Sequence, residues 1–417
     1  MIEAPGQLGR ALEGVTVLDL THMLSGPYAT MLMADLGART IKVEPPGTGE
    51  ATRELLRQTP KYERDGMGAY FLTLSRNKES VAIDLKAPAG RELFYELVRH
   101  ADVVVSNFGV GVLERLEIDH ARLTAVNPGI ITCAISGFGE TGPARHRPAF
   151  DLVAQGMGGG MSLTGREGDE PTRAGIPIGD LGGGLFGVIG VLSALQARAR
   201  TGLGQHVDIS MLDCQLSMLS YIATMYLMSG ELTERVGNGH FVHVPYNTFR
   251  TATRHLIIAV LTDTMWRDLV ELLDDPALAD PMFAHQPGRL AAKAFIEARV
   301  QGVLDQQSCE HWLEQLAAKR IPVAPVNDIA YAFEDEQTLA RGMRVKVPLA
   351  GGGHVEQPGN PVKLSLAAQD VFAPPPWLGQ HTEAVLRDLL GLDPGRIDSL
   401  TRQGIVQLGP LADAKLT

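Results

Sequence analysis

One carboxylate stands alone among small residues near the middle of the chain. Asp180 lies between Gly179 and the glycines at positions 182–184, and an apolar stretch follows it to about residue 202. The pattern predicts a long helix with Asp180 at its N-cap, where a carboxylate oxygen accepts backbone N–H groups. Each glycine inside a helix costs about 1 kcal/mol against alanine. Two explanations remain open: the helix packs closely against a neighbour, or Asp180 lies on the floor of a cleft where a ligand approaches the backbone.

The composition excludes several classes of protein. The 417 residues are 45% hydrophobic and 20% charged, which is enough for two domains with sizeable cores. A net charge of −11 disfavours nucleic acid as a partner. Three widely spaced cysteines predict buried thiols in a reducing compartment, without a disulfide or a zinc site. Neither a signal peptide nor a clean apolar run of about 20 residues is seen, which predicts a cytoplasmic protein with no membrane partner.

Strand-like and helix-like stretches alternate through the first half of the chain. An apolar run at residues 14–20, a helix that starts near Ser25 and a strand at residues 39–44 predict a βαβ unit with parallel strands. We therefore expect an open α/β sheet, with ligands beyond the carboxyl ends of its strands. Further predicted elements are strands at residues 70–74, 80–85, 103–105, 129–138 and 205–210 and a helix at residues 88–100.

Basic residues recur close to the ends of these strands. Scattered bases usually lie on solvated faces, but their recurrence favours an anion site in which side-chain charges and helix N-termini hold phosphates. The turn after the first strand lacks a G-x-G-x-x-G fingerprint, and the chain has no G-x-S-x-G motif. The candidate bases are Arg53, Arg76, Lys78, Lys86, Arg115, Arg145 and Arg147.

A polar, turn-rich segment at residues 230–247 predicts a change of domain. It contains His240 and His243, which are too few ligands for a metal, so no metal site is predicted. His240 is instead a candidate substrate contact. Cys133 lies inside a predicted strand and is expected in the core rather than as a nucleophile.

Short motifs occur in a fixed order along almost the whole chain. They are Leu12-Glu13-Gly14-Val15, Ser25-Gly26-Pro27, Asp35-Leu36-Gly37-Ala38, Lys42-Val43-Glu44, Asn77-Lys78, Asn107-Phe108, Gly137-Phe138-Gly139, Thr141-Gly142-Pro143, Gly179-Asp180, Thr201-Gly202-Leu203-Gly204-Gln205 and Leu378-Gly379-Gln380-His381-Thr382. Together they resemble the class III coenzyme A transferases, the family of formyl-CoA transferase and carnitine CoA-transferase. The resemblance implies a homodimer of interlocked rings. Each chain would have a large Rossmann-like domain from residues 1–230 and 331–417 and a small domain from residues 231–330.

The resemblance also implies the active site. Asp180 aligns with the nucleophilic aspartate of the family, which attacks an acyl-CoA and then carries CoA as a thioester. The CoA thioester is therefore a substrate, and no permanently bound cofactor is expected. The implied CoA contacts are Met23, Leu24, Ile83, Asp84, Leu85, Lys86, Asn107, Phe108, Gly109, Arg115, Phe150 and Asp151.

Two departures from formyl-CoA transferase bear on the substrates. Leu24 stands where that enzyme has a glutamine, and its long glycine loop is not found in residues 235–246. Residues 237–246 resemble instead family members that move CoA from succinyl-CoA to a dicarboxylic or hydroxy-dicarboxylic acid. A second acceptor carboxylate needs a cation, for which Arg53 and His240 are the candidates.

Two alternative functions use the same fold or the same ligand. A 2-methylacyl-CoA racemase would need a histidine just before Asp151 to move the α-proton, but Phe150 occupies that position. A non-catalytic acyl-CoA-binding protein would bind CoA without covalent labelling, and the intact Asp180 weighs against it. CoA transfer is therefore the predicted function, with an acyl-CoA, a small carboxylic acid and a second copy of the chain as partners.

Overall fold

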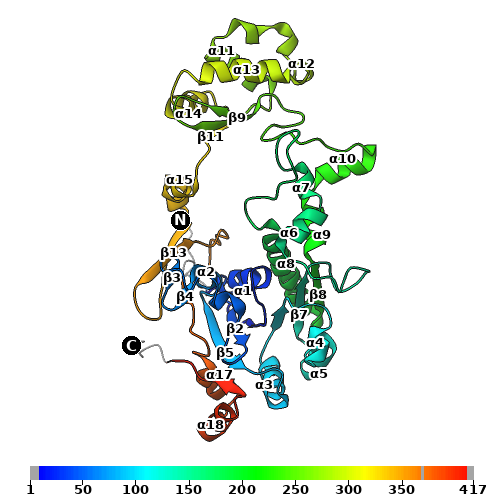
Figure 1. The fold of residues 1–417 in the computed structure, drawn as a ribbon, viewed down its shortest axis with the longest axis vertical. Helices are drawn as coiled ribbons and strands as arrows, with labels where there is room; N and C mark the ends of the chain where they lie inside the picture. The colour runs from blue at the N-terminus through cyan, green and yellow to red at the C-terminus, as the bar shows by residue number, and fades with distance from the viewer. Residues whose placement is uncertain (1–8, 368–370, 411–417) are drawn as a thin grey trace, which may run out of the picture. The chain divides into compact units, whose positions relative to one another are not determined.

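The computed structural model describes residues 9–367 and 371–410, and the chain divides into two compact units (Figure 1). The large unit contains the residues up to Gly160, Ala174–Ala223 and the residues from Glu336. The small unit contains Met161–Arg173 and Thr224–Asp335. The sequence-based boundaries at residues 230 and 330 lie a few residues from these limits, but they assign Met161–Arg173 to the large domain.

A seven-stranded sheet forms the centre of the large unit. Its order is β14-β5-β2-β1-β6-β7-β8, and all neighbouring strands are parallel except β14, which runs antiparallel to β5. Parallel strands are covered on both faces, which explains their almost unbroken apolar runs. The prediction of an α/β fold with a mostly parallel sheet is confirmed. The strands are β1 (Thr16–Asp19), β2 (Arg39–Glu44), β5 (Lys78–Ile83), β6 (Val103–Ser106), β7 (Ile131–Ser136), β8 (His206–Ser210) and β14 (Val406–Gln407).

Helices and two small hairpins complete the large unit. The helices are α1 (Ser25–Asp35), α2 (Ala69–Leu74), α3 (Pro88–Arg99), α4 (Val112–Arg115), α5 (His120–Val126), α6 (Asp151–Met157), α8 (Ile178–Thr201), α9 (Met211–Met218), α16 (Glu336–Ala340), α17 (Thr382–Asp388), α18 (Pro394–Arg402) and the 3₁₀ turn η1 (Ala51–Arg53). The hairpins are β3 (Glu63–Arg64) with β4 (Met67–Gly68), and β12 (Arg344–Pro348) with β13 (His354–Pro358). Two helices lie where the units change, α7 (Gly160–Leu163) and α10 (Tyr221–Ser229).

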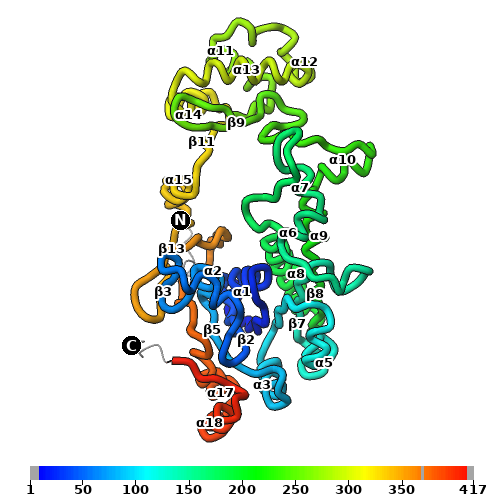
Figure 2. The backbone as a smooth tube through the Cα atoms, in the orientation of Figure 1, coloured from blue at the N-terminus to red at the C-terminus, as the bar shows by residue number. Residues whose placement is uncertain are grey.

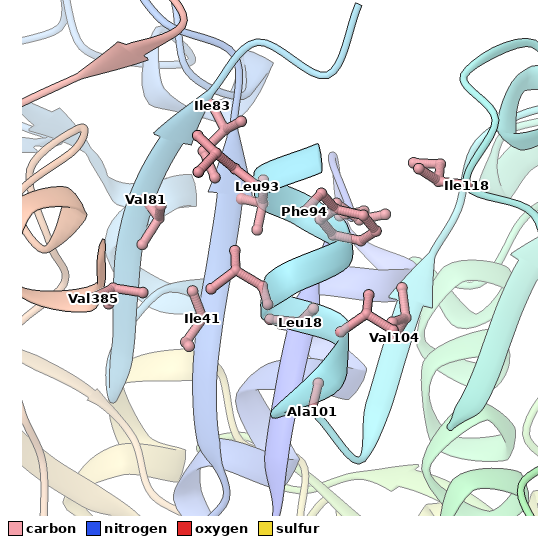
Figure 3. Packing of buried hydrophobic residues seen from close by; sticks show 14 of the residues in the cluster. Leu18, Ile41, Val81, Ile83, Leu93, Phe94, Ala101, Val104, Ile118 and Val385 are labelled. Atoms are coloured by element: carbon pink, nitrogen blue, oxygen red, sulfur yellow. The ribbon is translucent and has the colours of Figure 1, made fainter. Parts of the chain in front are cut away.

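An apolar core fixes the strands whose ends carry the site. Leu93, Phe94, Leu97 and Val98 form the buried face of α3, and Figure 3 shows Leu93 and Phe94 close to Leu18 of β1. Burying one such side chain fully contributes about 1.5–3 kcal/mol. The cluster therefore holds β1 and its neighbours rigidly below the strand ends.

The end of the chain returns to this sheet. Val406 of β14 pairs with Ile83 of β5, and the hydroxyl of Thr382 accepts the N–H of Ala82 at 3.0 Å. In Figure 2 the red C-terminal trace lies beside the blue and cyan trace of the first hundred residues. The large unit is thus built from both ends of the chain.

The small unit has its own core, around the antiparallel sheet β11-β10-β9. Its buried aromatic residues include Trp266, Phe283 and Trp312. The strands are β9 (Tyr246–Arg250), β10 (His255–Ala259) and β11 (Val323–Pro325). The helices are α11 (Asp263–Leu273), η2 (Pro276–Ala279), η3 (Pro281–Phe283), α12 (Gln286–Ala291), α13 (Lys293–Leu304), α14 (Cys309–Ala318) and α15 (Ile329–Glu334).

Two helices qualify the sequence predictions. Residues 70–74 were expected as a strand, but they lie in α2, so this prediction is wrong. Helix α8 is long and apolar enough to span a membrane by length and composition, and it is the one such helix in the described residues. In the fold, α8 packs against α1, α9 and β7, so it serves as a core helix of the large unit.

Candidate active site

A pocket of about 480 Å³ lies beyond the carboxyl ends of β1, β2, β5 and β6. Lys86 and Arg115 bring positive charge to its wall, and Ile83, Leu85 and Phe108 give it apolar surface. Open α/β sheets bind ligands at this edge. The volume is also in the range of about 300–1,000 Å³ that small-molecule sites have.

Side chains from neighbouring strand ends hold the turn between β1 and α1. Asn107, which follows β6, accepts the N–H of His22 at 2.9 Å and donates to the His22 carbonyl at 2.7 Å. Met23 has a φ of +62°, which residues other than glycine rarely adopt. Its N–H donates to Oε2 of Glu50 at 3.3 Å. The turn is therefore held in one shape at the edge of the pocket.

Buried ion pairs support this edge from below. Nζ of Lys78 lies 2.9 Å from Asp19, and Nζ of Lys42 lies 3.9 Å from it. The hydroxyls of Thr21 and Thr30 also donate to Asp19. Although burial alone would raise it, Lys42 and Lys78 lower the pKa of Asp19 well below its usual range. This carboxylate therefore has a structural role.

Asp180 lies in the first turn of α8. The helix begins at Ile178 with Pro177 as its N-cap, so the prediction that Asp180 itself is the N-cap is wrong. Asp151, the first residue of α6, supplies the capping oxygen instead. Its Oδ1 accepts the N–H of Gly179 at 2.8 Å and the N–H of Asp180 at 3.3 Å. Because the cap comes from another helix, the carboxylate of Asp180 is not needed to satisfy the helix end.

Burial and, second, the negative charge of Asp151 raise the pKa of Asp180 to about 6. The Asp180 side chain forms no ion pair within the described part of the chain. A carboxylate with this pKa is more basic than usual, yet it is still about 90% ionised at pH 7. Strong pKa shifts of this kind are typical of functional sites.

The glycines after Asp180 allow close packing. A Cβ at Gly184 would lie 2.7 Å from the carbonyl oxygen of Ser25 in α1, and one at Gly182 would lie 2.7 Å from Cε of Met218. All three glycines at positions 182–184 are buried. The packing explanation therefore holds for them. The small size of these glycines lets α8 approach α1, the helix that follows the β1 turn.

Comparison with known proteins identifies the family. The family model of CoA-transferase family III matches residues 12–382. The chain belongs to this family. The resemblance inferred from short motifs is confirmed, and the protein is an enzyme that transfers CoA.

Individual relatives of this CoA-transferase cover most of its length. Acetyl-CoA:oxalate CoA-transferase of Acetobacter aceti is 40% identical over 85% of this chain and 89% of its own. Succinyl-CoA:glutarate CoA-transferase of Mus musculus is 33% identical over 95% of this chain and 91% of its own. The crystal structure of a CAIB/BAIF family protein from Brucella suis has a TM-score of 0.82 and 37% identity, and the match covers 92% of this chain and 100% of that one.

The predicted CoA contacts of this CoA-transferase fall into two groups. Six of them line the pocket beyond the strand ends, namely Ile83, Asp84, Leu85, Lys86, Phe108 and Arg115. The other six are not among its lining residues. Of these, Leu24 is the N-cap of α1 and Phe150 precedes α6 with 64% of its surface exposed. The second group consists of Met23, Leu24, Asn107, Gly109, Phe150 and Asp151.

Three of the bases proposed for an anion site have structural partners. Arg76 pairs with Asp35 at 2.7 Å and Lys78 pairs with Asp19, all of them buried, so their assignment to an anion site is wrong. The guanidinium of Arg53 is also buried. It lies 2.7 Å from Glu44 and donates to the carbonyl of Pro376. This placement favours a structural role for Arg53 over the predicted contact with the acceptor acid.

Sequence reasoning missed two residues whose pKa values are shifted. Glu50 lines the pocket with 7% of its surface exposed, and burial raises its pKa. Burial raises the pKa of Tyr70, and the charges of Asp180, Glu50 and Asp151 raise it too. No motif marks either residue, and Tyr70 also falls in the run that was predicted as a strand.

Other candidate groups are not among the residues that line this pocket. His240 belongs to the small unit, in the turn before β9, where its ring stacks on Phe241 at 4.5 Å. Cys133 is buried in β7, and burial raises the pKa of its thiol to about 12, which confirms it as a core residue. Within residues 9–367 and 371–410, no group of three or more His, Cys, Asp or Glu is placed to hold a metal ion.

Proposed function

We propose that this enzyme moves CoA from succinyl-CoA to a dicarboxylic acid, with Asp180 as the nucleophile. The main support is a half-buried carboxylate in the first turn of α8 whose pKa is raised to about 6, on a helix that packs closely against α1, the helix that follows the β1 turn. The relatives' names support the substrates, since oxalate and glutarate are both dicarboxylic acids and succinyl-CoA is a named donor. A hydroxy-dicarboxylic acid fits the same proposal.

The first half-reaction places CoA on the enzyme. An oxygen of Asp180 attacks the thioester carbonyl, the C–S bond breaks, and CoA leaves as a thiolate while an anhydride joins Asp180 to the acyl group. The thiolate then attacks the carbonyl carbon of Asp180, and the bond between this carbon and the bridging oxygen of the anhydride breaks. The donor acid leaves as a carboxylate that carries one oxygen from Asp180. The aspartyl-CoA thioester remains, and no proton is consumed.

The second half-reaction repeats these steps with the acceptor. Its carboxylate attacks the aspartyl thioester, CoA leaves as a thiolate, and a second anhydride forms. The thiolate attacks the acceptor carbonyl, which releases the acceptor's CoA thioester and regenerates Asp180 with an oxygen from the acceptor. Each exchange replaces one carboxylate by another, so the reaction needs no metal and no permanently bound cofactor.

Side chains around the pocket would bind CoA and position the turn at the pocket edge. Lys86 and Arg115 would bind phosphates of CoA as charge-assisted donors. Asn107 and Glu50 position the β1–α1 turn at the pocket edge. Partial burial of Asp180 limits the water that would hydrolyse an anhydride or a thioester.

We also propose that two chains form an interlocked homodimer in the cytoplasm. Large apolar side chains are exposed in and after α10, including Leu227 at 80%, Met228 at 83% and Leu232 at 83%. Exposed large apolar side chains that recur in one segment support a contact with another chain. Light scattering should give the mass of a dimer, and a purely monomeric species would contradict this proposal.

Intact-protein mass spectrometry tests the proposed function. Incubation with succinyl-CoA should add the mass of CoA less one water, and hydroxylamine or borohydride treatment followed by peptide mapping should place the change at Asp180. Asp180→Asn is the matched control and should stay unmodified. Absence of any adduct with several acyl-CoAs would contradict CoA transfer through Asp180. Exchange of an α-proton in heavy water would then support the racemase.

A further inference from the structure

The loop between β7 and α6 is held on β8, the edge strand of the large sheet, by two side chains of that strand. Nε2 of His206 lies 2.7 Å from Oε2 of Glu140, and the carboxylate of Asp208 accepts the N–H of Glu140 at 3.0 Å. The loop, residues 137–150, contains two of the short motifs described above and leads to Asp151, which caps α8. Glu140 is therefore fixed to β8 through both its side chain and its backbone.

Thr132 of β7 joins His206 to a second histidine, His120 at the start of α5. Its Oγ1 lies 2.7 Å from Nδ1 of His206 and 2.8 Å from Nδ1 of His120. These three side chains and Glu140 line a pocket of about 280 Å³, separate from the strand-end pocket. A hydroxyl has one proton, so Thr132 can donate to only one ring and must accept from the other. The protonation of one ring therefore decides the tautomer of the other.

This chain of hydrogen bonds has two complete arrangements. In both, Nε2–H of His206 donates to Glu140, because an ionised carboxylate can only accept. In the neutral arrangement, Nδ1 of His206 accepts the hydroxyl proton of Thr132, and Thr132 accepts Nδ1–H of His120. In the charged arrangement, His206 has gained a proton on Nδ1 and donates it to Thr132, whose hydroxyl turns to donate to His120. His120 has then exchanged its Nδ1 proton for one on Nε2, so the pair gains one proton and loses no hydrogen bond.

The charges around the two rings place the added proton on His206. The hydrogen bond to Glu140 raises the pKa of His206, burial opposes this, and the charges of Glu140 and Asp208 raise it further. Burial lowers the pKa of His120, and so does the charge of His206, although Asp119 acts in the opposite direction. Because two charged rings 5.4 Å apart would repel each other, the pair takes up one proton and not two. Other ionisable groups lie on the pocket wall and on the helices that pack against β8, namely Glu114 and Cys133, Asp180, Arg198 and Arg200 of α8, and Asp213 of α9.

We propose that this chain of side chains, from Glu140 to His120, is a pH-sensitive clamp that holds residues 137–150 on β8. While His206 is charged, it forms an ion pair with Glu140, and after it loses the proton only the hydrogen bond remains. The folded-state pKa of His206 lies above the unfolded value of about 6.5. The clamp therefore contributes its full stabilisation below about pH 6.5 and loses it as the pH rises through the folded-state pKa. The loop then loosens next to the residue that caps α8, which makes the start of that helix sensitive to pH.

Hydrogen–deuterium exchange between pH 5.5 and 8.5 tests the clamp, with rates corrected for the intrinsic pH dependence of amide exchange. The amide of Glu140, which donates to Asp208, reports whether the loop is seated. Its protection in the wild type should fall about two- to tenfold as the pH rises, the effect of one partly buried ion pair. His206→Gln keeps a neutral donor for Glu140 and should show the lower protection at every pH. Thr132→Val removes the hydroxyl that accepts from charged His206, so the fall should begin at lower pH.

His285→Gln is the matched control, because His285 also pairs with a carboxylate, that of Asp263 at 2.8 Å, but with 82% of its side chain exposed. It should leave the protection of the loop unchanged. Constant protection in the wild type, an equal fall in His206→Gln, or an unmoved midpoint in Thr132→Val would overturn the inference.

Should the variants fail to fold, the wild type alone provides the test. Exchange at the C2 hydrogen of each histidine, followed by mass spectrometry, measures the titration of the two rings. A higher midpoint for His206 than for His120 would support the clamp, whereas an equal or lower one would overturn it.

Discussion

The large unit holds a fully buried carboxylate, Asp19, and a half-buried one, Asp180, whose pKa values shift in opposite directions. Asp19 lies beneath the β1 turn with Lys42 and Lys78 around it, and these charges hold its pKa low. Asp180 at the start of α8 has another carboxylate as its neighbour, and its pKa rises to about 6. The first arrangement stabilises the ionised form for structure. The second disfavours the ionised form and leaves a carboxylate that is more basic than usual.

Removing the carboxylate that we propose as the nucleophile should give the largest effect. Asp180→Asn should lower CoA transfer by about 10⁴-fold or more, because it removes the proposed nucleophile. The folded-state pKa of Asp180 lies above its unfolded value. The folded protein therefore loses stability as the pH rises from about 4 to about 6, because the ionised form of Asp180 is disfavoured in the fold. Asn removes this cost. After allowance for partial exposure, the variant should gain about 1 kcal/mol at pH 7, and thermal unfolding beside activity measures both effects.

Removing Lys78, a cation that pairs with the structural carboxylate of Asp19, should lower the stability of the protein. Lys78→Met leaves the buried carboxylate of Asp19 without one of its two paired cations, which typically costs about 3–5 kcal/mol of unfolding free energy. Lys319→Met, on the exposed pair with Glu271, should change stability by less than about 1 kcal/mol. Urea unfolding of both variants measures the difference. Similar losses in the two would contradict the distinction between the buried and the exposed pair.

The glycines of α8 offer a finer test of how the site is built. Gly184→Ala places a Cβ against the backbone carbonyl of Ser25, which cannot move aside, so we expect a loss of about 1–3 kcal/mol and reduced activity. Gly182→Ala meets only the flexible end of Met218 and gains helix propensity, so its net effect should stay within about 1 kcal/mol. If the glycines served ligand access alone, the two variants would be equally stable.

The smallest effect concerns Asp151, the charged neighbour of Asp180. Asp151→Asn keeps an oxygen that can cap α8 but removes the negative charge next to Asp180. The pKa of Asp180 should fall, so the acid limb of kcat/KM should move to lower pH by less than about one unit. A pH–rate profile from pH 4.5 to 8 measures the shift. A limb that stays in place would mean that burial alone sets this pKa.

Local patterns in the sequence were enough for much of the fold. Strand β2 has the predicted limits, Arg39–Glu44, and α3 was predicted to within one residue, because long periodic stretches carry their own signal. The five residues at 70–74 were too few to show a period, and their bulky apolar character resembled a strand. In the structure these residues form helix α2, and Phe71 and Leu72 are buried.

The candidate residues that sequence patterns indicate are those whose neighbours in the chain mark them. Asp180 is marked by its flanking glycines, and Lys86 follows a strand directly. Arg76 and Lys78 were misassigned because their partners, Asp35 and Asp19, lie about 40 and 60 residues away. Charge pairing across strands is a tertiary property, so a single sequence cannot separate a structural cation from a free one.

The most direct test of the central claim follows an oxygen atom. One turnover with succinyl-CoA and glutarate labelled with ¹⁸O in its carboxylates should leave one ¹⁸O in Asp180, because the second anhydride breaks on the acceptor side. Mass spectrometry should therefore find the peptide that contains Asp180 heavier by about 2 Da, with no label in the succinate released. Label in the succinate and none in the peptide would mean that the acceptor attacks succinyl-CoA directly, and it would contradict Asp180 as the nucleophile.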